Sequence, residues 1–276
     1  MRILNKIIKG FKNKYEKYQT YYKNKNLLDK NLALKDKFKG QRCFIIGNGP
    51  SIGRQDLRRL AGEETFVLNT FYNHPQFNEI RPKNYLAMDS GAPFFRDELF
   101  QKEKFLSQVN RLFFNLDFYD HFKKMGLYTD NRVHYLHIGG HFKENLNFNI
   151  EIHQTIPRIK NVVIASIMTA VYMGFEEIYL LGCEHSFLAS PRQFEEEHFL
   201  GISYFVNPKD EAERKYYAMH LKSYEGAIDQ AKILFQNYRF LKAKIAKTHP
   251  NVKIYNATPN SFLDVFPYVK YESIFR

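Results

Sequence analysis

Short apolar runs alternate with stretches of helical pattern along this chain, and the alternation constrains the fold more than any other feature. The apolar runs are residues 42–46, 65–69, 85–88, 111–115, 177–181 and 252–255, and each stops at a polar residue. Helical patterns separate several of them, most clearly at residues 162–173 and 216–247. Strands joined through helices favour an α/β fold with a mainly parallel sheet and helices on both faces.

The length and composition favour one principal domain. The chain has 276 residues, of which 44% are hydrophobic, enough to bury a large core. We expect a basic amphipathic helical arm over residues 1–40 and one nucleotide-binding domain over residues 41–276. The two cysteines, Cys43 and Cys183, each lie near an end of an apolar run, which favours reduced, buried thiols in a cytoplasmic protein. No membrane-spanning run or export signal is expected.

Positive charge is concentrated in the arm. Residues 1–40 contain Arg2 and eleven lysines against Glu16, Asp29 and Asp36, so they hold +9 of the formal charge of +12. Aromatic and aliphatic residues recur within the arm every three or four positions, which predicts a helix with one apolar face and lysines around it.

Two interpretations of the arm stay open. Residues 1–25 fit an anionic membrane surface, which would make the protein peripheral on the inner face of the cytoplasmic membrane. Alternatively, the aromatic face packs on the domain behind it. Nucleic acid is not expected as a partner, because no nucleic-acid-binding motif accompanies the charge.

The first apolar run ends in a glycine-rich turn, Gly47-Asn48-Gly49-Pro50-Ser51. Its glycines permit close backbone approach, and free backbone N–H groups at such a turn suit an anionic phosphate. The turn lacks the third glycine of the dinucleotide fingerprint and the Lys-Ser/Thr pair of the Walker loop. We therefore expect either a nucleotide site of another type or a purely structural turn.

Polar residues follow other strands of the expected sheet. They are Asn69 and Thr70 after the second run, Asp89 and Ser90 after the third, and Gly182, Glu184, His185 and Ser186 after the run at 177–181. Ligands of open α/β sheets bind at the carboxyl ends of the strands. These residues are therefore expected to face one crevice together with the glycine-rich turn.

Three segments of the sequence, taken together, resemble a known family. They are Ile45-Ile46-Gly47-Asn48-Gly49-Pro50-Ser51, Leu68-Asn69-Thr70-Phe71-Tyr72, and residues 172–185 with the core Ile178-Tyr179-Leu180-Leu181-Gly182-Cys183-Glu184-His185. In order and spacing they resemble the bacterial sialyltransferases of glycosyltransferase family 42 and the related DUF115 group of surface-polysaccharide biosynthesis, such as capsule or lipopolysaccharide. The closing residues Ile254 to Ser261 fit the same pattern, so the resemblance runs from about residue 42 to 266.

The resemblance implies a Rossmann-like, GT-A-like fold and a metal-independent transferase without a cofactor. The donor would be a CMP-activated acidic sugar such as sialic acid or Kdo, and the acceptor a surface glycan or glycolipid. The implied nucleotide-contacting residues are Asn48, Asn69, Thr70, Asp89, Asn260 and Ser261, with Gly182 and Glu184 at the end of the strand beside them.

The sequence departs from that pattern after the run at 177–181. The sialyltransferases hold the leaving phosphate there with tyrosines, whereas this chain has His185, Ser186 and Phe187. Their entry to the preceding helix is also shortened here, to Asn161-Val162-Val163. The transferred sugar can therefore differ, and neutral or amino sugars stay open.

Transfer to a hydroxyl requires a general base, and a histidine suits that role near neutral pH. The candidates are His220, His198 and His185, of which His220 best matches the family's base. Residues 187–217, polar and interrupted by prolines, would form a lid. His185 is also a candidate donor to the leaving phosphate, because it ends a strand.

His134, His137 and the segment 139–141 do not complete a recognisable metal-ligand spacing. We interpret them as a solvated strand face and a loop, and expect no metal site.

Two other functions stay open. A pyrophosphokinase of the pterin type would bind ATP and magnesium through carboxylates such as Asp89 and Glu184. A non-catalytic module of a polysaccharide assembly complex would bind nucleotide weakly or not at all. The sequence leaves the oligomeric state undetermined.

Overall fold

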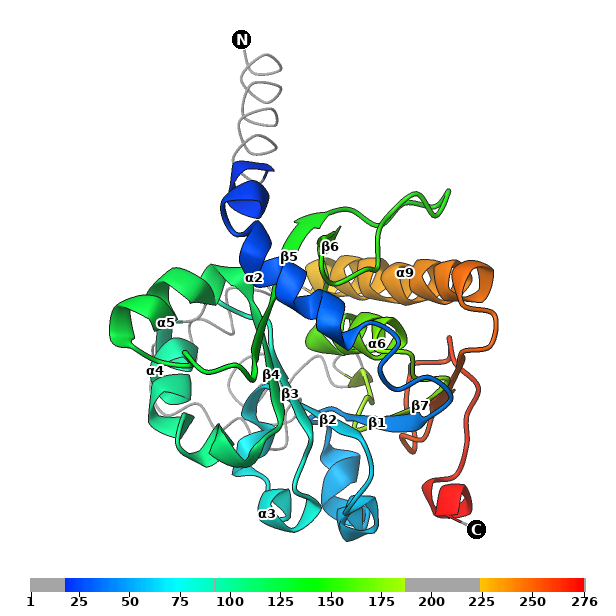
Figure 1. Ribbon diagram of the computed structural model, residues 1–276. Coiled ribbons are helices and arrows are strands. Elements are labelled where there is room, and N and C mark those ends of the chain that lie inside the picture. The colour runs from blue at the N-terminus through cyan, green and yellow to red at the C-terminus, as the bar shows by residue number, and fades with distance from the viewer. Residues whose placement is uncertain (1–17, 92, 187–223, 276) are drawn as a thin grey trace.

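A parallel sheet of eight strands forms the centre of the computed structural model, which describes residues 18–91, 93–186 and 224–275 (Figure 1). The strands are β1 (Arg42–Ile46), β2 (Thr65–Leu68), β3 (Asn84–Ala87), β4 (Arg111–Asn115), β5 (Val133–Gly140), β6 (Thr155–Pro157), β7 (Glu177–Leu181) and β8 (Lys253–Asn256). Their order across the sheet is β6-β5-β4-β3-β2-β1-β7-β8, and every neighbouring pair is parallel. The predicted α/β fold with a parallel sheet is confirmed.

Helices cover both faces of the sheet (Figure 1). The α-helices are α2 (Lys25–Asp29), α3 (Phe77–Ile80), α4 (Pro93–Lys102), α5 (Tyr119–Met125), α6 (Val162–Tyr172) and α9 (Tyr224–Thr248). The 3₁₀ helices are η1 (Lys30–Leu34), η2 (Pro50–Arg54), η3 (Leu57–Leu60), η4 (Asn69–Asn73), η5 (Phe105–Gln108), η6 (Leu116–Phe118) and η9 (Tyr271–Phe275). One buried cluster joins the sheet to α6 and α9, and a second joins it to α3, α4 and α5. Across the described ranges, no helix is both long and apolar enough to cross a bilayer.

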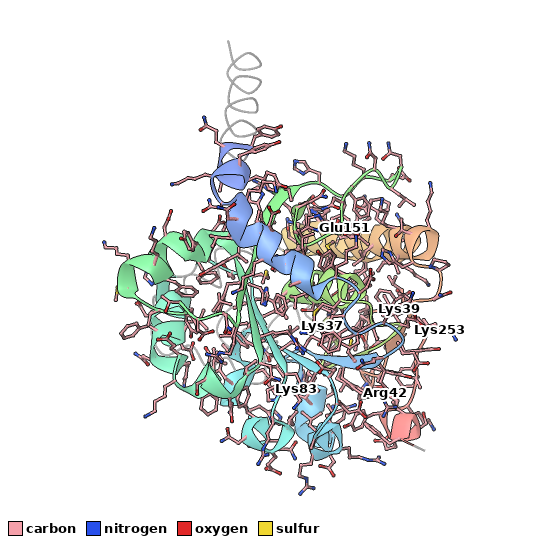
Figure 2. The ribbon with its side chains drawn as sticks, viewed as in Figure 1. Lys37, Lys39, Arg42, Lys83, Glu151 and Lys253 are labelled. Carbon is pink, nitrogen blue, oxygen red and sulfur yellow. The ribbon has the colours of Figure 1, made fainter. Side chains whose placement is uncertain are left out.

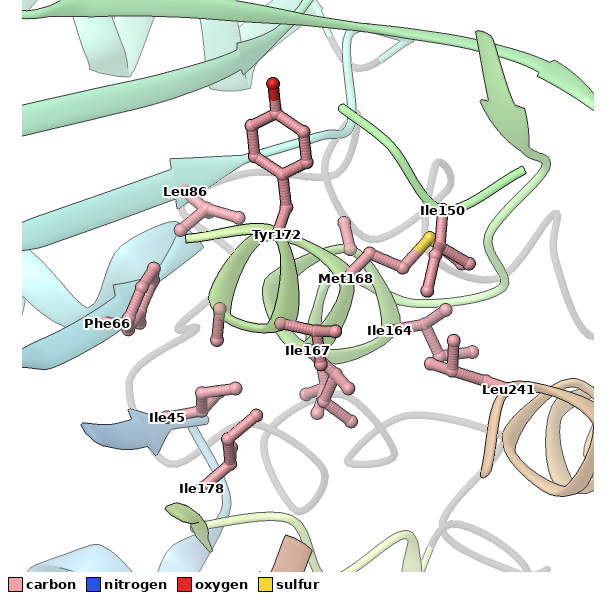
Figure 3. Close-up of a cluster of buried hydrophobic side chains, with 14 of the residues drawn as sticks. Ile45, Phe66, Leu86, Ile150, Ile164, Ile167, Met168, Tyr172, Ile178 and Leu241 are labelled. Atoms are coloured by element: carbon pink, nitrogen blue, oxygen red, sulfur yellow. The ribbon is translucent and has the colours of Figure 1, made fainter. Parts of the chain in front are cut away.

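Helix α6 is the centre of the first cluster. All its residues from Val163 to Tyr172 are buried, in keeping with a helix that is apolar on every side. Figure 3 shows Ile167 of α6 on the side of the helix that faces the strand residues Ile45 and Ile178. Leu241 of α9 lies on another side of α6. This packing fixes the start of α6, and thereby Asn161, relative to the end of β7.

The predicted strands agree with the structure to within one or two residues at their ends. Residues 42–46, 111–115 and 177–181 are strands over the predicted ranges. Asn69, predicted to end a strand, begins η4 instead.

Strands β5 and β6 were not among the predicted strands, and the interpretation of His134 and His137 as a solvated face is wrong. Their side chains are 5% and 4% exposed. His134 hydrogen-bonds Asn31 at 3.0 Å, and His137 hydrogen-bonds Thr155 at 2.8 Å. Distant polar partners thus allow β5 to be a buried strand despite its two histidines.

Part of the basic arm is packed against the sheet. Asn31 is fully buried, and its amide nitrogen donates to the carbonyls of Tyr135 and Ile152 at 2.9 Å each. Further along, the backbone N–H of Asp36 donates to Tyr172 O, and that of Phe38 to Met173 O. Residues 31–38 are therefore bound to β5 and to the end of α6. The expectations for residues 1–17 lie outside the described residues.

Ion pairs tie together the amino ends of the central strands. Arg42 contacts Glu63 at 2.5 Å, and Arg111 contacts Glu64 at 2.7 Å. Figure 2 shows Arg42 and Lys253, the first residues of β1 and β8, on the side of the molecule where Lys37 and Lys39 also lie. These four basic side chains therefore lie near the strand starts, at the end of the sheet opposite the glycine-rich turn.

Buried histidines, among them His74 and His134, predict a loss of stability in mild acid. Burial lowers the pKa of His74 to about 4 and that of His134 to about 3. Below the unfolded pKa of about 6.5, the unfolded chain takes up protons that the folded chain does not. We therefore expect the free energy of unfolding to fall from pH 6.5 towards pH 4, by about 1.4 kcal/mol per pH unit for each histidine.

Denaturant unfolding at pH 7 and pH 5 measures this loss. His134→Gln, which does not titrate, should show a smaller difference between the two pH values than the wild type, whatever its stability at pH 7. An equal difference in both proteins would contradict the assignment to His134.

Candidate functional site

The strand order places a topological switch point between β1 and β7. After β1 the chain builds β2 to β6 on one side, and it then returns to add β7 and β8 on the other side of β1. The connections leave the carboxyl ends of β1 and β7 in opposite directions, which opens a crevice there in folds of this kind. The turn at residues 47–51 and the segment at residues 182–186 meet at this point.

Backbone hydrogen bonds hold the two segments together. Gly47 N–H donates to Leu181 O at 2.8 Å, and Gly49 N–H donates to Gly182 O at 3.0 Å. A Cβ on Gly47 would lie 2.4 Å from Gly182 O, so the approach is open to glycine alone. Gly182 itself has a φ of 62°, which glycine adopts without strain. The glycines of the turn therefore serve the junction of β1 with β7.

Glu184 caps the same turn. Its Oε1 accepts the backbone N–H of Ser51 at 2.6 Å, and its Oε2 occupies the space that a side chain on Gly49 would fill. Glu184 is 7% exposed, so this is a buried carboxylate held against the turn.

The expectation of free N–H groups at the turn is wrong for Gly47, Gly49 and Ser51. Their donors are bonded to Leu181 O, Gly182 O and the Glu184 carboxylate. The turn continues as the five-residue 3₁₀ helix η2 and not as a long α-helix. These three donors are therefore not available to a phosphate.

Asn48 links the turn to β2. Its Nδ2 donates to Leu68 O at 3.1 Å and lies 3.3 Å from Thr70 Oγ1. Because a carbonyl oxygen only accepts, the amide nitrogen must face Leu68, and Oδ1 faces away as an acceptor. Asn69 follows with a φ of 47°, a left-handed conformation that asparagine tolerates.

Four buried side-chain atoms near this junction have no hydrogen-bond partner among the described residues: Asn48 Oδ1, Asn69 Oδ1, Ser51 Oγ and Glu184 Oε2. Each costs about 1–3 kcal/mol if it stays unpaired. Three of the four are acceptors, and the fourth is a hydroxyl. The site therefore complements a ligand that donates hydrogen bonds, such as ribose hydroxyls or an amino group on a base, better than it complements a phosphate.

Asp89 and Ser90 follow β3, two strands from the switch point. Asp89 is exposed, and its Oδ1 accepts Gly91 N–H at 3.0 Å, while Ser90 Oγ lies 3.4 Å from Asp117 Oδ2. β3 and β7 are separated by β2 and β1, so the Asp89 and Glu184 backbones lie about 14 Å apart across the sheet. That separation does not favour one magnesium ion held by both carboxylates.

The segment after β8 is fastened to the end of β7. Thr258 Oγ1 accepts the Cys183 N–H at 3.0 Å, and Ser261 Oγ donates to Cys183 O at 2.6 Å. The hydroxyl of Ser261 is therefore used within the protein. Asn260, with a φ of 53°, lines a cavity of about 530 Å³ between Thr258 and Tyr268.

His185 takes part in a partly buried network with Asn161 and Tyr238. The Tyr238 hydroxyl lies 2.9 Å from His185 Nε2, and Asn161 Nδ2 donates to the Tyr238 oxygen at 2.9 Å. Asn161 Oδ1 accepts the N–H of Ile164 and thereby caps α6. The Tyr238 oxygen accepts a hydrogen bond from Asn161, and its own hydroxyl can donate to His185 Nε2 or to Asn161 Oδ1, 3.3 Å away. Asn161 Nδ2 also lies 3.3 Å from Nε2, which favours Nε2 as an acceptor.

This network favours one tautomer of the imidazole, the one in which Nε2 accepts. Burial lowers the pKa of His185 to about 4, so the ring is neutral near pH 7. A neutral ring that accepts at Nε2 carries its proton on Nδ1. His185 also has a φ of 54°, an uncommon conformation for a residue other than glycine. The sequence missed Tyr238, because nothing local in α9 indicates that it meets residue 185.

The other two histidine candidates, His198 and His220, and the expected lid at residues 187–217, lie outside the described residues. Across the described ranges, no three His, Cys, Asp or Glu side chains come together as metal ligands.

No family model matches the chain, and no curated protein matches it. Several solved structures are similar to the chain. The chain is similar to the sialyltransferase CstII from Campylobacter jejuni in complex with the substrate analogue cytidine-5'-monophosphate, with 18% identity over 82% of this chain and 84% of that one and a TM-score of 0.43. The same enzyme with CMP-3FNeuAc gives 21% identity, 83% and 85% coverage, and a TM-score of 0.43. The MAf glycosyltransferase from Magnetospirillum magneticum AMB-1 gives 16% identity over 90% of this chain and 38% of that one, with a TM-score of 0.46.

Proposed function

We propose that this chain is a glycosyltransferase that moves an acidic sugar from a CMP-linked donor to a glycan acceptor. The observation that carries the proposal is the set of unpartnered buried atoms of Asn48, Asn69, Ser51 and Glu184 at the switch point. The sequence segments that supply them are the ones that resemble the family 42 sialyltransferases. The acceptor-rich chemistry suits the hydroxyls of a ribose and the amino group of cytosine.

In the proposed mechanism, His185 donates a hydrogen bond to the leaving phosphate and does not act as the general base. Breaking the bond from the anomeric carbon to the phosphate oxygen leaves negative charge on CMP, which hydrogen-bond donors stabilise. Because Tyr238 donates to Nε2, the proton on Nδ1 makes the neutral ring such a donor. A neutral His185 is suited to donate a hydrogen bond and not to take up a proton, because a pKa of about 4 makes the ring a weak base.

The acceptor hydroxyl attacks the anomeric carbon and gives its proton to a base. We propose His220 for this role, with His198 second, in line with the sequence resemblance. We also propose that the reaction runs in the cytoplasm, with residues 1–25 holding the enzyme against an anionic membrane where a lipid-linked glycan would be presented.

Binding of CMP tests the nucleotide assignment. We expect CMP in the presence of EDTA to raise the melting temperature of the wild type, because a ligand that binds the folded state stabilises it by mass action. Asn48→Ala should bind CMP about tenfold more weakly, since it removes one acceptor of the site. Asn110→Ala, which changes an exposed asparagine away from the crevice, should bind CMP as the wild type does.

The melting temperature of each variant without nucleotide is measured first, because Asn48 also bonds β2. Stabilisation by ATP and magnesium with no response to CMP would contradict the proposal and favour the pyrophosphokinase. No response to any nucleotide would favour a non-catalytic module.

A further inference from the structure

A second cavity, of about 840 Å³, lies away from the switch point, between the helical residues 18–23, here called the N-terminal helix, and the β5–β6 edge of the sheet. Its size falls in the range of small-molecule sites. β5 is four strands from β1, so the cavity lies about 19 Å across the sheet from the glycine-rich turn. It is therefore separate from the proposed nucleotide crevice.

The strands themselves create this cavity. β5 pairs with β4 as far as Leu136 and then runs on to Gly140, and its register with β6 shifts between Ile138 and Gly140. Gly139 and Gly140 carry no side chains, so the end of β5 leaves space above it. The buried ring of His137, held by Thr155, lies below. The floor is thus built from ordered strand residues.

Aromatic rings close one side of the cavity. Tyr18 and Tyr21 line it from the N-terminal helix, and the Tyr21 ring lies 6.0 Å from that of His137. Tyr18 is 62% exposed, so its ring is accessible to a ligand from solvent. These two tyrosines offer flat apolar surfaces together with hydroxyl groups.

The rim is cationic and rich in amides. Lys143 and Arg158, both exposed, line the cavity with His141, and the side-chain amides of Asn147 and Gln154 stand beside them. Among the described lining residues there is no aspartate or glutamate. Guanidinium and ammonium groups bind carboxylates, and amides bind hydroxyl groups.

We propose that this cavity is a binding site for an acidic carbohydrate, with Arg158 and Lys143 on the carboxylate and Tyr18 and Tyr21 against the sugar rings. A hollow with amides and rings fits an oligosaccharide better than a lipid surface, which needs exposed cations alone. The proposal does not depend on the transferase reaction, because a non-catalytic module would use the same site.

Titration calorimetry of the full chain at low salt tests the site with trigalacturonic acid, and with maltotriose as the neutral trisaccharide. We expect trigalacturonic acid to bind and maltotriose to bind at least about tenfold more weakly. The double variant Lys143→Gln/Arg158→Gln should bind the acid about tenfold more weakly than the wild type. Lys104→Gln/Lys270→Gln removes the same charge from exposed positions outside this cavity and should bind like the wild type.

Tyr21→Ala should also weaken the binding of trigalacturonic acid. Because this variant keeps the charge of the protein, such a loss distinguishes a defined binding site from non-specific electrostatic attraction. Equal loss in both double variants, or equal binding of the two trisaccharides, would overturn the proposal. So would binding to vesicles of phosphatidylcholine and phosphatidylglycerol without binding of trigalacturonic acid. Asn48→Ala should leave this binding unchanged, so failure here is separable from failure of the nucleotide crevice.

Discussion

Replacing Gly47 by alanine should destabilise the fold by about 3 kcal/mol and abolish nucleotide binding. The added Cβ would lie 2.4 Å from the carbonyl oxygen of Gly182 and 3.1 Å from its carbonyl carbon. Both atoms belong to the backbone, so the clash cannot be relieved by turning a side chain. β1 and β7 must move apart at the switch point, which also displaces the Glu184 carboxylate from Ser51.

Denaturant unfolding measures the loss of stability, and CMP binding measures the damage to the crevice. Gly140→Ala is the matched control, because a Cβ there meets its nearest atom at 3.5 Å, which is an ordinary contact. The control should change the free energy of unfolding by less than about 1 kcal/mol. A Gly47→Ala protein as stable as this control would show that the β1–β7 junction is looser than the distances indicate.

His185→Ala should lower the rate of sugar transfer about 100-fold or more, which is the usual effect of removing one donor to a developing negative charge. His185→Asn should retain most of the activity, within about tenfold of the wild type. The amide nitrogen of asparagine occupies nearly the same place as Nδ1 of histidine and donates a hydrogen bond. Asparagine also tolerates the positive φ of this residue.

The comparison of these two variants separates a donor from a base. Asparagine cannot take up a proton, so if His185 were the general base, both variants would be equally inactive. The measurement is release of CMP from CMP-sialic acid or CMP-Kdo, whichever the wild type consumes, with kcat and KM determined separately. His121→Ala, on α5 away from the crevice, is the histidine control.

Tyr238 acts through His185 in this scheme. Tyr238→Phe removes the donor to Nε2 and allows the ring to change tautomer, so it should lower kcat more than it raises KM. A fall in stability alone, with kcat unchanged, would assign Tyr238 to the core.

The parallel sheet could be predicted because its central strands are continuous apolar runs that stop at polar residues. β1, β4 and β7 are buried by helices on both faces, and such strands show their ends clearly in a sequence. β5 does not. Its histidines are compatible with burial only because Asn31 and Thr155 supply hydrogen bonds from elsewhere in the chain.

The site was predictable in position and not in detail. Residues after strands of a parallel sheet must lie at one edge, so Asn48, Asn69 and Glu184 could be grouped from the sequence alone. The direction of each donor and acceptor could not, because Glu184 meets Ser51 across 133 residues and Tyr238 meets His185 across 53. The local sequence pattern does not indicate which residues pair over such distances along the chain.

The docking of Asn31 sets the limit for any shortened form of the protein. A chain cut after residue 40 would expose the carbonyls of Tyr135 and Ile152 to water and strip Leu28 and Leu34 from the surfaces they cover. A chain that starts before Tyr18 would keep α2, η1 and the two tyrosines of the second cavity in place. The folded body therefore includes part of the lysine-rich segment, where charge alone gives no sign of it.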